Sequence, residues 1–189
     1  MDNMLFEIAP PVPPSANHAI FFAAVPPEEI KDEIAAAWQI AGTSDRFRRR
    51  TLHMSILDVM NTKTVDESLL FSLQNNIANL SLNQFTVVFD RIMAFGGGAI
   101  VLGTADASTE ANTLAADLQR QLVRNGIKPK GSVKVTPHVT MAYGARFPET
   151  RMLRAPVHWT VTDLVLIDSL FGQGRHVPLA RWPLRAPPA

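Results

Sequence analysis

Two short apolar stretches, TLHMSIL and TPHVTMA, each place a histidine and a hydroxyl residue two positions apart. Because side chains two apart on a strand point to the same face, His53 shares a face with Ser55, and His138 shares one with Thr140. Imidazole can both take and give a proton near neutral pH, so two facing histidines can act as base and acid. The hydroxyls can donate hydrogen bonds to non-bridging phosphate oxygens. This set of residues predicts in-line attack on a phosphodiester.

Each histidine stretch follows closely on a basic segment, RFRRR at 46–50 or KPKGSVK at 128–134. Arg50 and Lys134 are therefore candidate substrate-binding residues, because nearby cations offset the charge that develops on a phosphate. A basic run taken alone is more often a solvated loop, and that alternative stays open for both segments.

A third triplet of the same type, HWT, begins at His158. It follows RAPV and no basic segment, so we interpret His158 as a structural histidine near the start of a strand. The alternative for His53 and His138 is that both are core histidines, each hydrogen-bonded to a nearby hydroxyl. Their matched context favours the catalytic interpretation.

Other kinds of site find little support in the chain. Zero cysteines exclude disulfides, thiolate zinc sites and a cysteine nucleophile. The chain has no H-E-x-x-H zinc motif and no G-x-S-x-G serine-hydrolase motif. The glycines at 96–98 lack the following Lys-Ser/Thr of a phosphate-binding loop. We expect no metal and no cofactor.

The elements that must position these side chains follow from hydrophobic periodicity and capping signals. One helix is predicted over 26–42 and another over 107–126. A third is predicted to follow a capping box formed by Thr64 and Glu67. Strands are predicted over 18–25, 51–59, 135–142, 159–170 and 175–184, with a hairpin of 83–95 and 99–105 and a loop rich in Arg and Pro before residue 159. The residues expected on buried helix faces are Ile30, Ile34, Trp38, Ala41, Ala111, Leu114, Ala115, Leu118 and Leu122.

The order strand, helix, basic loop, histidine strand occurs over 18–59 and recurs over about 99–142. This echo of element order, without sequence identity, predicts two similar α+β lobes that each contribute one histidine strand. A chain of 189 residues suffices for one domain whose lobes share a core. We expect 1–189 to be a single bilobal domain, with a flexible proline-rich lead at 1–16 and a frayed tail at 185–189.

The composition is that of an ordinary globular protein, with 47% hydrophobic residues, 19% charged residues and a net charge of +1. The small net charge gives no basis for a general attraction to nucleic acid. No apolar run reaches the ~18 residues of a membrane span, and an early Asp and a proline cluster stand where a signal peptide would be apolar. We expect a cytoplasmic monomer without membrane contact, and the lack of cysteine suits that compartment.

Together these features resemble the two-histidine (2H) phosphoesterase superfamily, and within it the bacterial and archaeal family called 2′-5′ RNA ligase or RNA 2′,3′-cyclic phosphodiesterase. Both signature motifs, H-x-[ST] followed by an apolar residue, are present as HMSI and HVTM. The segments HAIFFAAVPPEEI, FDRIMAFGGGAIVLG and LVLIDSLFGQGRHVPLARWPL resemble the family's opening strand and helix, central hairpin and closing strands. The resemblance implies a bilobal α+β fold with two pseudo-symmetric lobes, antiparallel sheets lining a central cleft, and helices outside.

The resemblance also implies metal-independent hydrolysis of a 2′,3′-cyclic phosphate to a 2′-phosphate, with RNA ends or cyclic nucleotides as substrates. His53 and His138 would carry the acid and base roles, and Ser55 and Thr140 the phosphate contacts. Which histidine is the base stays open. Two alternatives also stay open: 2′-5′ joining of RNA ends at the same site, and a non-catalytic RNA- or nucleotide-binding module that uses the basic segments.

The chain departs from the family pattern near the substrate. Many members carry a basic residue shortly after the second motif, where this chain has AYG at 142–144. An aromatic residue is usual near His176, in the last strands. The substrate end of the site is therefore expected to differ, with Tyr143 as a candidate stacking surface for a nucleobase.

Overall fold

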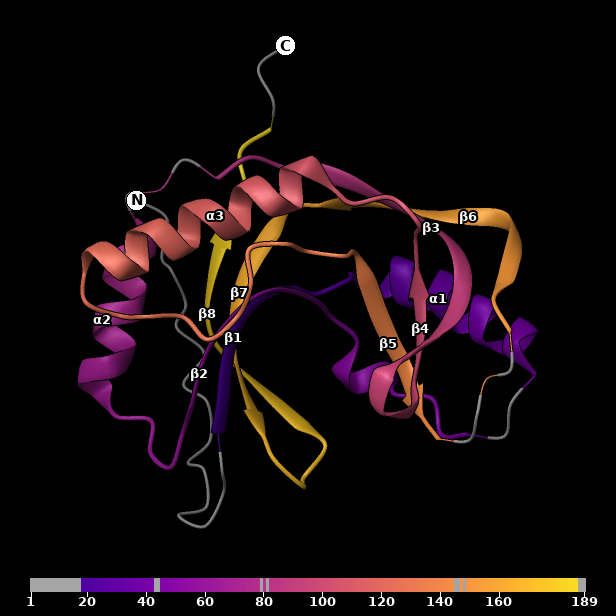
Figure 1. Ribbon diagram of the computed structural model, residues 1–189, viewed down its shortest axis with the longest axis horizontal. Helices are drawn as coiled ribbons and strands as arrows, with labels where there is room; N and C mark the ends of the chain where they lie inside the picture. Colours follow the sequence, from indigo (N-terminus) through magenta and orange to yellow (C-terminus); the bar gives the residue numbers. More distant parts are fainter. Residues whose placement is uncertain are drawn as a thin grey trace.

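A computed structural model describes residues 18–186, apart from 43–44, 79, 81, 145–146 and 148. In this part of the chain, eight strands form two four-stranded sheets in which every neighbouring pair is antiparallel (Figure 1). One sheet consists, in spatial order, of β2 (Met54–Thr62), β1 (His18–Ala24), β7 (Asp163–Leu170) and β8 (Arg175–Pro183). The other consists of β5 (His138–Tyr143), β4 (Ala99–Gly103), β3 (Phe85–Phe95) and β6 (Arg151–Val161). The α+β fold with antiparallel sheets is as expected.

The two histidine stretches lead into edge strands. β2 lies at the edge of the first sheet and β5 at the edge of the second, and these two strands contact each other. An edge strand pairs on one side only, so its other side is open to a neighbour or a ligand. The sheet order therefore places the two stretches at the junction of the sheets.

The helices lie outside the sheets, as expected, and two of them contact the sheet that does not contain the strand before them. α1 (Glu28–Ala41) follows β1 yet contacts β6 of the second sheet. α3 (Thr109–Arg124) follows β4 yet contacts β2, while α2 (Glu67–Ala78) contacts α3 and β8. Figure 1 shows α2 and α3 on the side of β1, β2, β7 and β8, and α1 on the side of β3 to β6. The first and second halves of the chain thus each place a helix against a strand of the other half.

Local sequence explains where α1 and α3 end and which face each buries. The residues expected to be buried in the two helices are all buried. Gly42 closes α1 with a φ of 64°, a left-handed conformation that glycine adopts without steric strain. The Ser108 Oγ atom accepts a hydrogen bond of 3.1 Å from the backbone N–H of Ala111 and so caps α3.

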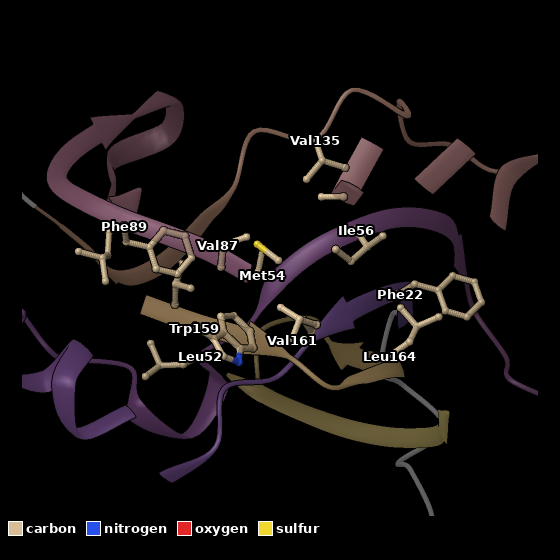
Figure 2. Close-up of a cluster of buried hydrophobic side chains, with 14 of the residues drawn as sticks. Phe22, Leu52, Met54, Ile56, Val87, Phe89, Val135, Trp159, Val161 and Leu164 are labelled. Carbon is tan, nitrogen blue, oxygen red and sulfur yellow. The ribbon is translucent and has the colours of Figure 1, made fainter. Parts of the chain in front are cut away.

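One continuous cluster of buried apolar side chains joins the two sheets. It includes Phe22 and Met54 from the first sheet and Phe89 and Trp159 from the second, and Figure 2 shows these side chains together in the interior. The Phe89 and Trp159 rings lie 6.4 Å apart, centroid to centroid. Burial of such large apolar side chains contributes about 1.5–3 kcal/mol each. A shared interior of this kind fixes one sheet relative to the other, and with it the two edge strands.

The strand prediction was wrong after β5. Residues 151–158, expected to form a loop, are the first part of β6. The strand expected over 159–170 is two strands, because β6 ends at Val161 and β7 begins at Asp163. β6 pairs with β3 and β7 pairs with β1, so the chain passes from one sheet to the other at Thr162. The apolar pattern continues through this change of sheet and does not mark it.

The capping box predicted from Thr64 and Glu67 was also wrong. The Asp66 Oδ1 atom accepts hydrogen bonds from the backbone N–H of Leu69 at 2.8 Å and from Ser68 Oγ at 3.0 Å. Asp66 is therefore the residue that caps α2. The carbonyl oxygen of Thr64 instead accepts a hydrogen bond of 2.7 Å from the Thr62 hydroxyl.

The ends of the chain were predicted to be loosely held. Arg185, the first residue of the tail expected to fray, donates its backbone N–H to the Leu82 carbonyl at 2.7 Å and accepts from the Gln84 N–H at 2.9 Å. The lead at 1–16 and residues 187–189 lie outside the described residues. None of the described helices is long and apolar enough to cross a membrane.

Candidate functional site

His53 lies immediately before β2, and its imidazole is half-buried. Its Nδ1 atom is 2.8 Å from the backbone carbonyl oxygen of Thr51. A carbonyl oxygen only accepts, so Nδ1 carries the hydrogen and Nε2 keeps its lone pair in the neutral ring. The bond fixes both the tautomer and the orientation of the ring.

His138 repeats this arrangement in the other sheet. It is the first residue of β5, is also half-buried, and has its Nδ1 atom 2.7 Å from the carbonyl oxygen of Thr136. Both histidines therefore donate Nδ1–H to the carbonyl two residues earlier and leave Nε2 for chemistry. The sequence T-x-H-x-[ST] encodes both halves of the arrangement.

The two imidazoles are electrostatically coupled. The pKa of His53 is lowered from its usual value, chiefly because burial disfavours the charged ring, and further by the positive charges of Arg48 and His138. The hydrogen bond to Thr51 acts in the opposite direction. His53 is therefore neutral at neutral pH, the state that accepts a proton.

The hydroxyl residues lie on the predicted faces. Thr140 is half-buried between the buried residues Val139 and Met141, as the alternation along β5 requires. Ser55 pairs with Ala23, which belongs to the small apolar cluster of Phe21 on the face of the sheet that carries His53. Each histidine thus has a hydroxyl on its own side of its strand.

The alternation of faces in TLHMSIL does not hold to its last position. Strict alternation would put Leu57 on the face of His53, but Leu57 is 1% exposed and belongs to the shared core with Met54 and Ile56. The pairing with β1 shifts by one residue between Ser55 and Leu57, which is a β-bulge. The bulge turns Leu57 inward.

Each histidine packs against at least one aromatic ring that the sequence did not place in the site. The His53 ring lies 4.8 Å from the His176 ring and 5.0 Å from the Phe21 ring, centroid to centroid. The His138 ring lies 4.6 Å from that of Phe95. Burial, together with the charges of His53 and Arg48, lowers the pKa of His176 to about 4. His176 is therefore a neutral ring at neutral pH, packed edge to face against His53.

One residue of the basic segments, Arg48, acts on the site, and it was not among the residues predicted from the sequence. The guanidinium of Arg48 lies 4.8 Å from the centroid of the Tyr143 ring, a cation–π contact. Arg49 is ion-paired with Glu28 and Asp32 on α1 at 2.9 Å and 2.8 Å. Tyr143, a predicted substrate-binding residue, thus contacts Arg48, whose charge acts on His53.

Arg50 and Lys134, the other two predicted substrate-binding residues, are exposed. Among the described residues neither one makes a hydrogen bond, ion pair or cation–π contact with the histidines. The segment before Lys134 runs along β2, where Lys130 and Gly131 donate their backbone N–H groups to the carbonyls of Val59 and Asp58 at 3.0 Å and 2.9 Å. Lys134 therefore lies in the segment that leads into β5.

His158 lies apart from this site. It is exposed and occupies the second half of β6, opposite Val88, rather than the start of a strand. β6 is the edge of its sheet farthest from β5. Within the described residues, no three His, Asp or Glu side chains gather where they could hold a metal ion.

The antiparallel α+β fold and the matched histidine strands define a 2H phosphoesterase. The family model of the 2′-5′ RNA ligase superfamily matches residues 26–172, and the chain belongs to this superfamily. Membership supports an enzyme that acts on phosphodiester bonds, by hydrolysis or by ligation. No curated protein matches the chain.

Solved structures share the fold. E. coli LigT complexed with 3′-AMP is 22% identical, with a TM-score of 0.72 over 90% of this chain and 99% of that one. TT0787 of Thermus thermophilus is 16% identical, with a TM-score of 0.69 over 89% and 98%. The MHV ns2 PDE domain is 19% identical, with a TM-score of 0.54 over 81% and 99%. The fold implied by the sequence resemblance is confirmed.

Proposed function

We propose that this protein is a metal-independent phosphodiesterase that opens a 2′,3′-cyclic phosphate to a 2′-phosphate. One observation carries the proposal: two imidazoles from different sheets are fixed by the same Nδ1 hydrogen bond and coupled in charge. Two rings held in one tautomer with Nε2 unused suit proton transfer at opposite ends of a small anion.

In the proposed reaction, His53 is the base and His138 the acid. Neutral His53 takes a proton at Nε2 from water while the water oxygen attacks phosphorus in line with the bond to O3′. That bond breaks, and Nε2–H of protonated His138 gives its proton to O3′. The product is a nucleoside 2′-phosphate with a free 3′-hydroxyl, and Ser55 and Thr140 donate hydrogen bonds to the non-bridging oxygens throughout.

The ligand class is supported by the structurally similar proteins. E. coli LigT has been solved in complex with 3′-AMP, NADP⁺, ATP and phosphate, all of which are phosphate-bearing ligands and three of them nucleotides. We extend this class to the present chain, with RNA ends or cyclic nucleotides as substrates and Tyr143 as a stacking surface for the base.

The direct test supplies the four nucleoside 2′,3′-cyclic monophosphates in the presence of a chelator. Conversion to the 2′-monophosphate, followed by ³¹P NMR, is the expected result. Retention of all four substrates, or formation of the 3′-monophosphate, would contradict the proposal. RNA oligonucleotides that end in a 2′,3′-cyclic phosphate, assayed in parallel, distinguish RNA ends from free nucleotides.

Ligation is the second candidate, because the superfamily that contains this chain is described by that activity. In this reaction a 5′-hydroxyl takes the place of water: its oxygen attacks phosphorus, the bond to O3′ breaks, and a 2′-5′ link forms beside a free 3′-hydroxyl. The same two proton transfers are needed, one from the attacking hydroxyl and one to O3′. Cleaved tRNA halves at high concentration are the test substrate. A 2′-5′ linked product supports ligation, and its absence while cyclic phosphate is hydrolysed leaves hydrolysis as the reaction.

The pH dependence follows from the environment of His53. The base must be neutral, and its pKa is lowered below the ordinary 6.5. On the acidic side the rate therefore falls only when the pH drops through this lowered value. We expect the acidic limb of kcat/KM against pH to have its midpoint below 6.5, and the alkaline limb to report loss of the proton from the acid.

The measurement pairs kinetics with the ¹H NMR titration of the His53 ring. A kinetic midpoint that matches the NMR pKa of His53 assigns the base. An acidic limb at or above 6.5, or one that matches His138 instead, would reverse the assignment of the two roles.

A further inference from the structure

Arg48 is tied to the second histidine strand although it precedes the first. Its backbone N–H donates a hydrogen bond of 2.8 Å to the carbonyl of Met141, the residue after Thr140 in β5. The basic loop therefore bridges the two edge strands at this point. A residue anchored in this way reaches both halves of the site.

The side chain of Arg48 packs against an aromatic ring and has no acidic partner in the part of the chain that the structure describes. Its guanidinium lies 4.8 Å from the centroid of Tyr143, which is 57% exposed at the end of β5. Among the described residues no carboxylate pairs with Arg48, whereas its neighbour Arg49 is bound by two. A stack on an aromatic face orients a guanidinium but leaves its N–H donors unused.

This unpaired charge acts on the site. Next to burial, the charge of Arg48 is one of the causes that lower the pKa of both His53 and His176. The charge of Arg48 therefore reaches both imidazoles. A half-buried cation that acts on two neutral rings and has no carboxylate partner in the described part of the chain is an environment that a bound anion stabilises.

We propose that Arg48 binds the non-bridging phosphate oxygens of the substrate together with Ser55 and Thr140, and that Tyr143 holds the Arg48 guanidinium in place. The role rests on the proposed function, and it adds a residue that lies outside both H-x-[ST] motifs. A planar fork of donors matches two phosphate oxygens, and the charge offsets what develops there during in-line attack. Tyr143 acts through Arg48 and is in this respect a positioning residue.

The test compares Arg48→Ala and Arg48→Lys with Arg120→Ala as a control. Arg120 lies on α3, is 59% exposed, and loses the same charge. Two quantities are measured: kcat/KM for a nucleoside 2′,3′-cyclic phosphate, and the Kd of inorganic phosphate from the ring proton shifts of the histidines. We expect Arg48→Ala to lower kcat/KM about 10²–10³-fold and to weaken phosphate binding at least about tenfold. Arg48→Lys keeps the charge but loses the bidentate geometry, so its kcat/KM and phosphate affinity should lie between those of the wild type and Arg48→Ala.

Tyr143 is tested by Tyr143→Phe and Tyr143→Ala. Phe keeps the ring face under the guanidinium, so we expect it to retain most phosphate affinity, whereas Ala loses part of it. Arg48→Ala should also raise the pKa of His53 and His176 in the NMR titration, which a purely structural role of Arg48 would not do.

The outcomes separate this inference from the proposed function. Failure of the wild type to hydrolyse any cyclic phosphate defeats the proposed function, while phosphate titration still decides the role of Arg48. Unchanged phosphate affinity in Arg48→Ala overturns the inference. So does an equal loss in Arg50→Ala, which would assign the effect to the general charge of the basic loop.

Discussion

Replacing either His53 or His138 by alanine is expected to lower kcat/KM for a nucleoside 2′,3′-cyclic phosphate by about 10²–10⁴-fold. In the proposed mechanism each ring supplies one of the two proton transfers, and each ring is fixed by its bond to a backbone carbonyl, at 2.8 Å and 2.7 Å. Because the two rings act as a unit, kcat/KM of the double variant should be only slightly below that of the less active single variant. Initial rates at neutral pH with chelator present measure the effect.

His158→Ala is the matched control. It removes the histidine of the third H-x-[ST] triplet, which is exposed on β6 and remote from β5. Activity close to that of the wild type is expected, since exposed substitutions rarely change stability by more than about 0.5 kcal/mol. Equal activity in all three alanine variants would end the two-histidine mechanism. Thermal unfolding of each variant separates loss of chemistry from loss of fold.

Local patterns predicted most of what positions the histidines. The face of α3 is an example: the five residues chosen from a period of 3.6 are the five that are buried. The alternation of β5 is another, with His138 and Thr140 half-buried and Val139 and Met141 enclosed. Both features depend on neighbours within one element, which a periodic pattern records.

The prediction of the fold was wrong where the secondary structure depends on which strands pair with each other. The first part of β6 carries Arg151, Arg154 and Pro156, which are unfavourable in a central strand. β6 is an edge strand, where proline and charge are tolerated. The change of sheet at Thr162 is likewise set by the partners β3 and β1, which no window of sequence contains.

The same reason explains the unpredicted part of the site. Arg50 is nearer to His53 in the sequence, but the Arg48 backbone is the one bound to Met141, more than ninety residues away. His176 reaches His53 only because β8 and β2 belong to one sheet and Phe21 of β1 lies against both rings. The motif could point to the two histidines from the sequence alone, whereas the residues around them depend on which strands pair.

A buried pair outside the site has the second large effect that we predict. The His18 Nδ1 atom on β1 lies 2.6 Å from Asp168 Oδ2 on β7, and the two residues are only 4% and 1% exposed. Within the described part of the chain, Asp168 Oδ1 has no hydrogen-bond partner. His18→Leu would leave a buried carboxylate with no partner for either oxygen. We expect the free energy of unfolding to fall by about 3–5 kcal/mol, measured by urea denaturation at neutral pH.

The double variant His18→Leu/Asp168→Leu distinguishes a buried polar penalty from a packing defect. Removing both partners leaves no unsatisfied group, so much of the lost stability should return even though two side chains have changed. The exposed substitution His158→Leu provides the reference and should change stability by about 0.5 kcal/mol or less. If His18→Leu lowered the free energy of unfolding as little as this reference, the Asp168 carboxylate would have found water or another partner. If the double variant lost more stability than both single variants combined, the shape of the side chains at this position would matter more than their pairing.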